Sequence, residues 1–197
     1  MYNSSIQHAK VLLSKKWLPG LLLCGLICWG AAPAHAGDAF NACAKKAAAR
    51  DLEAKKDFQN RLHALIVTGK PEFKALAAIN RDLQIQLAKA RKEKLEYLLK
   101  KHPERIITTQ GISRFTNFDW SDADESRFLS ESETNKKRQE SIADLNERNN
   151  FHTDWPRLRG FFRSELTKTP AYKTLMSDFT KSQVEVKKIL SACNPSK

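Results

Sequence analysis

The stretch HAGDAFNACAKKAAARD, residues 35–51, is where this sequence of 197 residues changes character. An apolar N-terminal run ends just before it, and a charged, alanine-rich segment carrying a single cysteine, Cys43, begins within it. Residues of this composition predict the first helix of a folded domain. The stretch therefore poses two questions, whether a protease cuts here and which residue pairs with Cys43.

Residues 1–36 have the composition of a secretory signal peptide. Three lysines and no acid come first, the apolar run WLPGLLLCGLICWGAA follows, and Ala34 and Ala36 provide an A-x-A cleavage site. A membrane-spanning helix needs about 20 apolar residues, whereas this run is shorter and contains glycine and proline. We therefore expect cleavage after Ala36 and a periplasmic or secreted protein; the alternative is an uncleaved anchor.

Two cysteines, Cys43 and Cys193, remain once the leader is removed. In an oxidising compartment an isolated pair of this kind usually forms one disulfide. Both cysteines fall on apolar helix faces near opposite ends of the mature chain, which favours an intramolecular bridge. The alternatives are two free thiols or bridges between molecules.

Helical signals dominate the rest of the sequence, and no alternating β-branched run predicts a strand. Glycine and proline at "TGKPEF" (68–73), and prolines at "KHPE", "DWPRL" and "KTPAY", mark helix boundaries. Ser121 and Asp124 have the spacing of a capping box. The sequence predicts an all-α fold, an elongated antiparallel bundle of about four main helices in a single domain, 37–197, with its N- and C-terminal helices joined by one disulfide. The predicted helical segments are 39–67, 72–101, 121–148 and a last helix in two pieces, 155–166 and 171–192.

The segment 102–120 lacks a long helical period yet is rich in isoleucine and aromatic residues. Loops of this length with their own apolar content are often functional. The simpler interpretation is that these side chains cover one end of the bundle, since aromatic residues in small domains mostly belong to the core.

No pattern in the sequence indicates catalysis. There is no HExxH, CxxC, CxxCH or GxSxG motif, and the few glycines of the mature chain exclude a phosphate-binding loop. A noncovalent haem could rest only on His63 and Met176, and a single methionine on an apolar face is usually core. We therefore expect no enzyme activity, no metal and no cofactor.

Charge is the remaining functional signal. The formal net charge is +12, and residues 45–105 contain sixteen lysines or arginines against eight acids. Residues 119–133 contain six acids and one arginine. This polarity is typical either of complementary neighbouring helices or of a basic surface for anionic partners. Export and the absence of a recognition motif argue against nucleic acid.

We accordingly expect a noncatalytic binding or accessory protein of the bacterial envelope. Its partner would be a protein or an anionic envelope component, with peripheral contact to a membrane surface as one form of that binding. A holdase-type chaperone is the main alternative; an enzyme of unknown reaction and a purely structural protein are weaker ones. The sequence leaves the partner, the oligomeric state and the biological process open. The residues predicted to bind are Lys89, Arg91, Lys92, Lys94, Lys100 and Lys101, with Phe115, Phe118 and Trp120 as apolar anchors.

Overall fold

Helices form where the apolar spacing predicts them. In the computed structural model, which describes residues 34–107 and 114–193, all regular secondary structure is helical, and the predicted all-α class is confirmed. Within the described residues, short 3-10 turns at Pro71–Phe73, Pro103–Arg105 and Leu166–Lys168 accompany the helices. The α-helices of this part of the chain are α1 (Ala34–Gly69), α2 (Lys74–Lys101), α3 (Asp122–Ser130), α4 (Glu133–Asn150), α5 (Trp155–Ser164) and α6 (Pro170–Ala192).

The predicted helix 121–148 is in fact two helices. Ser121 caps α3 in a complete capping box with Asp124, as predicted. A second serine, Ser132, then adopts an extended backbone conformation and accepts a hydrogen bond from the amide of Asn135, which starts α4. The prediction of one continuous helix was wrong because Ser132 acts as this second N-cap.

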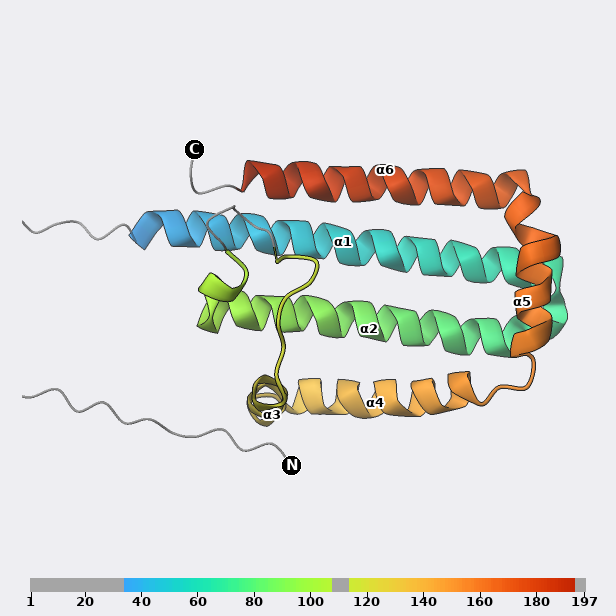
Figure 1. Cartoon of the computed structure of the whole chain (residues 1–197), viewed down its shortest axis with the longest axis horizontal. Helices are drawn as coiled ribbons and strands as arrows, with labels where there is room; N and C mark the ends of the chain where they lie inside the picture. Colours follow the sequence, from blue (N-terminus) through green and yellow to red (C-terminus); the bar gives the residue numbers. More distant parts are fainter. Residues whose placement is uncertain (1–33, 108–113, 194–197) are drawn as a thin grey trace, which may run out of the picture. The chain divides into compact units, whose positions relative to one another are not determined.

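The long helices lie side by side in the order α6, α1, α2, α4 (Figure 1). Neighbours run antiparallel; α1 packs against both α2 and α6, and α4 packs along α2 (Figure 1). The short helix α3 is seen end-on in this view, and α5 crosses the ends of α1 and α2. The arrangement leaves α4 and α6 as opposite edges of a row, and the finer prediction of a four-helix bundle is not confirmed.

Apolar side chains gather in two main clusters at opposite ends of α1 and α2. The first joins the start of α1, the end of α2 and the end of α6 with Ile106 and Phe115, which are both buried. The second lies beneath α5, where Leu158 and Phe161 pack on Phe73 and Leu76 from the start of α2. A smaller cluster joins α2 to α4. The two main clusters hold the helices together at both ends of the row. All three clusters stabilise the fold by removing apolar surface from water.

A disulfide joins Cys43 of α1 to Cys193 at the end of α6. Their Cα atoms are 5.5 Å apart, within the usual range for a bridged pair. Cys193 is 5% exposed, and both residues border the first apolar cluster. The bond therefore links the first and last helices, which are 150 residues apart in sequence.

The predicted signal peptide falls largely outside the described residues, since α1 begins at Ala34 and the leader was assigned to 1–36. Among the described helices, none combines the length and the apolar character that crossing a membrane requires.

Candidate functional site

The six predicted basic residues all lie on the C-terminal half of α2, which packs between α1 and α4. Because a helix turns by about 100° per residue, these six side chains leave α2 in several directions. Their surroundings fall into three groups, those that hold the segment 114–120, those paired with a carboxylate, and those without an ion pair.

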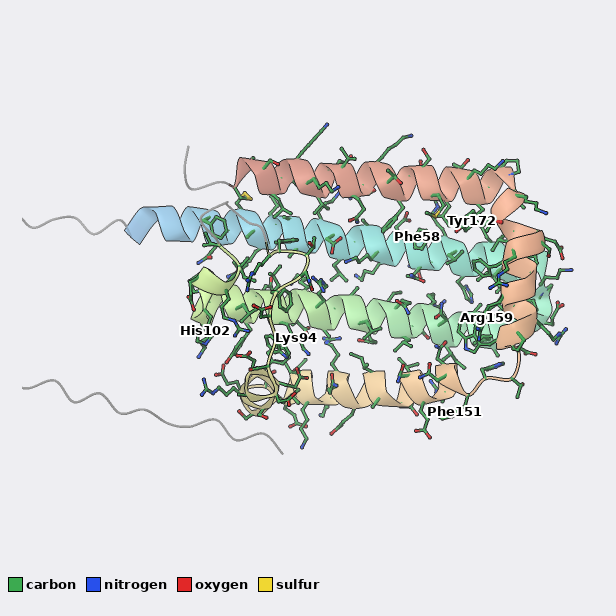
Figure 2. All side chains as sticks on the ribbon, in the orientation of Figure 1. Phe58, Lys94, His102, Phe151, Arg159 and Tyr172 are labelled. Atoms are coloured by element: carbon green, nitrogen blue, oxygen red, sulfur yellow. A yellow bond between two sulfur atoms is a disulfide. The ribbon has the colours of Figure 1, made fainter. Side chains whose placement is uncertain are left out.

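Arg91 and Lys94 hold the segment 114–120 against α2. The Arg91 guanidinium donates to the carbonyl oxygen of Thr116 and lies 5.0 Å from the centre of the Phe118 ring. Lys94 lies on α2 (labelled in Figure 2), and its ammonium is 4.9 Å from the centre of the Trp120 ring and 2.5 Å from the Glu125 carboxylate. Cation–aromatic contacts of this kind stabilise by about 0.5–1 kcal/mol at exposed sites. Both cations therefore have a structural role in this arrangement.

The three predicted anchors pack against the apolar core of the protein. Phe115 is 5% exposed and belongs to the first apolar cluster, and Phe118 and Trp120 are half-buried against that cluster. The Trp120 ring makes edge contacts with Tyr97 and Phe128, at 5.9 and 5.5 Å between ring centres. Edge-to-face pairs at these distances stabilise a core. Residues 114–120 thus pack over one end of the helices.

Lys92 and Lys101 each pair with a glutamate. Lys92 lies 2.9 Å from Glu96, one turn further along α2, and Lys101 lies 3.3 Å from Glu131. Lys89 and Lys100 form no ion pair within the described part of the chain, and Lys100 is exposed. Among the six predicted cations, these two retain a charge that no carboxylate of the described residues neutralises.

A groove of about 380 Å³ lies beside Lys100, between α1, α2 and the α3–α4 segment. Its acidic side chains all have basic partners: Glu93 accepts two hydrogen bonds from Arg138, at 2.7 and 2.8 Å, and the other two pair as described above. Its remaining cations, Lys45 and Lys100, form no ion pair among the described residues. The groove, called the basic groove below, is lined by Lys45, Glu93, Glu96, Tyr97, Lys100, Lys101, Phe128, Glu131 and Asn135.

Lys45 is the groove residue that sequence reasoning missed. It lies on α1, more than fifty positions before Lys100, and belongs to the opening alanine-rich stretch. Only the antiparallel packing of α1 on α2 brings the two lysines to one groove. The paired basic residues at 45 and 46 were the signal available in the sequence, and nothing in their spacing relates them to α2.

An ion pair between Arg105 and Asp124 holds the start of α3 in place. Arg105 donates to the Asp124 carboxylate at 2.9 Å, and the same carboxylate accepts from the Ser121 amide. The Arg105 guanidinium, with help from the Ser121 hydrogen bonds, holds the pKa of Asp124 well below its usual range. The pKa of Arg105 is raised for the same reason. Asp124 is 8% exposed, so this charge is available to Arg105 and to the α3 cap but hardly to an outside partner.

A second hollow, of about 350 Å³, lies between α1 and α6 and is mainly apolar. Its one charged residue, Arg61, is already bonded to Asp57 and Asp178 at 3.3 and 2.9 Å. Those bonds raise the pKa of Arg61 further. The other lining residues are Ala64, Leu65, Ala171, Thr174 and Leu175.

The described residues contain no group of three or more histidine, cysteine or carboxylate side chains placed to hold a metal ion. His63 lies near Arg81, and burial first, then this positive neighbour, lowers the pKa of its imidazole. The most distinctive chemical feature of the described residues is the unpaired positive charge of Lys45 and Lys100 in the basic groove.

The chain was compared with protein-family models, with curated proteins and with solved structures, and none of the three comparisons found a match.

Proposed function

We propose that this is an exported, noncatalytic binding or accessory protein of the bacterial envelope. Its basic groove captures an acidic protein segment or another anionic envelope component. The four long helices α1, α2, α4 and α6 serve as an antiparallel scaffold for this groove. The leader-like residues 1–36 support export, and a disulfide between distant cysteines is typical of oxidising compartments.

One observation carries the proposal. Lys45 and Lys100 line the groove without a carboxylate partner among the described residues, while all three glutamates of the groove are paired with other cations. The acids in the groove are therefore held in place and screened, and the unpaired lysine ammonium groups attract an anion. The half-buried Tyr97 provides apolar surface beside these charges, and its ring packs edge-on against the buried Phe128.

The four other predicted cations contribute indirectly. Arg91 and Lys94 position the segment 114–120, and Lys92 and Lys101 neutralise Glu96 and Glu131. Lys89 extends the positive potential along α2. In this proposal the aromatic anchors shape the end of the groove from inside the protein.

Polyglutamate is a suitable probe of acidic protein segments. We expect the protein to bind it at low ionic strength and to release it as salt rises, because the Debye length falls to about 10 Å at 0.1 M. The double variant Lys45→Glu plus Lys100→Glu should weaken binding by about tenfold or more, because each reversal replaces an attraction of up to about 1 kcal/mol by a repulsion.

The matched control is Lys187→Glu plus Lys188→Glu on α6, which makes the same change in net charge at two exposed lysines without ion pairs in the described part of the chain. If both double variants lose affinity equally, net charge and not the groove binds the probe. If the wild-type protein does not bind polyglutamate but suppresses aggregation of an unfolded client, the holdase alternative replaces the proposal.

A further inference from the structure

The end of the protein formed by α5 carries a second concentration of positive charge. It comprises residues 70–74 and 151–173, where α5 crosses the ends of α1 and α2 away from the disulfide (Figure 1). The 28 residues of α2 correspond to about 42 Å of helix. The α5 end and the basic groove are therefore separate surfaces.

The charges at the α5 end do not balance. These two segments contain seven basic and three acidic residues. Every acid is engaged: Glu165 pairs with Lys70 at 3.4 Å, and Arg157 lies 3.1 Å from Asp154 and 3.8 Å from Glu72. Five cations have no ion pair among the described residues: Lys74, Arg159, Arg163, Lys168 and Lys173.

The outer face of α5 carries two of these five cations, Arg159 and Arg163, beside Gly160 and Ser164. Leu158 and Phe161 are buried toward α1 and α2, so the residues on the opposite side of the helix face solvent. Gly160 lies on that opposite side, and a Cβ added there would meet no atom within 4 Å. Packing within the protein therefore does not require a glycine at position 160. A glycine there does allow a binding partner to approach the helix backbone closely. The exposed neighbours on α5 are Pro156, Arg157, Arg159, Arg163 and Ser164.

An exposed aromatic side chain lies at the same end. Phe151, which follows α4 and precedes α5, is 81% exposed, the largest value for a large apolar side chain among the described residues. Figure 2 shows it at the end of α4, next to the connection to α5. An exposed phenylalanine at the same end of the protein as exposed arginines suits the interfacial region of a bilayer.

From this juxtaposition we propose that the α5 end seats on an anionic phospholipid surface. Arg159 and Arg163 contact headgroup phosphates, and Phe151 enters the interface between headgroups and acyl chains. An anionic bilayer suits this end because it offers phosphates to the unpaired arginines and an apolar interface to the exposed Phe151. The proposal does not depend on the basic groove. With both surfaces engaged, the protein would hold an acidic partner at a distance from the membrane.

The test uses the protein as the host produces it and vesicles made from equal parts of phosphatidylglycerol and phosphatidylcholine. Each basic residue near an anionic bilayer strengthens partitioning by roughly fivefold. The variant Arg159→Glu plus Arg163→Glu should therefore reduce partitioning by at least about 25-fold. Phe151→Ser should reduce it severalfold while keeping its salt dependence, because it removes apolar contact and no charge.

Two variants with the same change in net charge serve as controls, Lys187→Glu plus Lys188→Glu and Lys45→Glu plus Lys100→Glu. Both should partition to vesicles within about threefold of wild type, since neither lies at the α5 end. Circular dichroism checks that every variant keeps its helical content. Failure of the wild-type protein to bind these vesicles at low ionic strength overturns the proposal, as does an equal loss in the controls. Loss of polyglutamate binding in the Arg159 and Arg163 variant, with vesicle binding unchanged, assigns the face to an acidic protein instead.

Discussion

Two glycines at the α5 end have opposite surroundings. Gly69 is the last residue of α1, and a Cβ there would lie 2.8 Å from the ring of Phe161, which is 7% exposed. Gly160 lies in the interior of α5, with open space where a Cβ would be. The sequence marked Gly69 as a helix end, but it contained no sign that a phenylalanine more than ninety residues later packs against it. Close contacts of this kind are set by packing alone.

Alanine at these two positions should have effects of opposite sign. Gly160→Ala should raise the free energy of unfolding by about 0.5–1 kcal/mol, because glycine disfavours the interior of a helix by that amount. Gly69→Ala should lower it by about 1–3 kcal/mol through overpacking against Phe161. Urea denaturation measures both. Stabilisation by Gly69→Ala would show that Phe161 is free to move aside.

A second residue-scale prediction concerns the Arg105–Asp124 pair. The folded pKa of Asp124 lies below its unfolded value of about 3.9. The unfolded chain therefore takes up the proton first as pH falls, and the stabilisation from this pair, complete at neutral pH, is lost in the acid range below about pH 5. Asp124→Asn should destabilise by about 1–3 kcal/mol at neutral pH.

Urea denaturation of wild type and Asp124→Asn over a pH series checks the sign. The difference between the two proteins should shrink as pH falls toward 3, because the unfolded wild-type chain then binds a proton at Asp124 that the folded protein does not bind. A difference that stays constant with pH would mean that the Asp124 charge contributes nothing.

At the scale of elements, the sequence predicted where helices form. It did not predict which helices pack against each other. Apolar spacing, Gly69 and the prolines located most helix ends to within a few residues. The break at Ser132 was missed because the segment is mostly polar. It has too few apolar residues to show where one helix ends and the next begins. Of the charge pairs, Lys92–Glu96 has the helical spacing of four that a sequence can reveal. Lys94–Glu125 and Arg138–Glu93 link different helices and depend on their packing.

The capping box of α3 provides a prediction for a single element. Ser121→Ala removes the acceptor of the Asp124 amide hydrogen. It should lower the stability of α3 by about 1 kcal/mol. Because α3 has only nine residues, the loss should appear there first. Hydrogen exchange should accelerate for α3 amides, with α1 and α6 unchanged. Uniform acceleration across all helices would show instead that α3 unfolds only with the whole protein.

At the scale of the whole molecule, the sequence placed Cys43 and Cys193 on the first and last helices, and the structure joins them. That pairing was predictable because two of the four cysteines fall in the predicted leader, and the remaining two allow one intramolecular bridge. The basic groove was not, since it combines a lysine of α1 with residues of α2 and the α3–α4 segment. Its existence depends on the order of helices in the row, which hydrophobic periodicity does not encode.

The bridge closes a long loop and should matter for stability. The loop-entropy relation allows about 5 kcal/mol for a separation of 150 residues, and measured bridges usually give about 2–4. Cys43→Ala plus Cys193→Ala should therefore lower the free energy of unfolding by about 2–4 kcal/mol, measured by urea denaturation. Reduction of the wild-type protein with a thiol should have the same effect, and no effect in either case would show that the bridge does not constrain the unfolded chain.

The most direct test of the proposed function is an NMR titration of the protein, labelled with nitrogen-15, by polyglutamate. We predict that the largest amide shifts occur around Lys45 on α1, around Lys100 on α2 and around Asn135 on α4, and that added salt reverses them. Shifts of this kind would place the acidic ligand in the basic groove. Largest shifts on α5 or α6, or no shifts at low ionic strength, would contradict the proposal that this groove is the binding site.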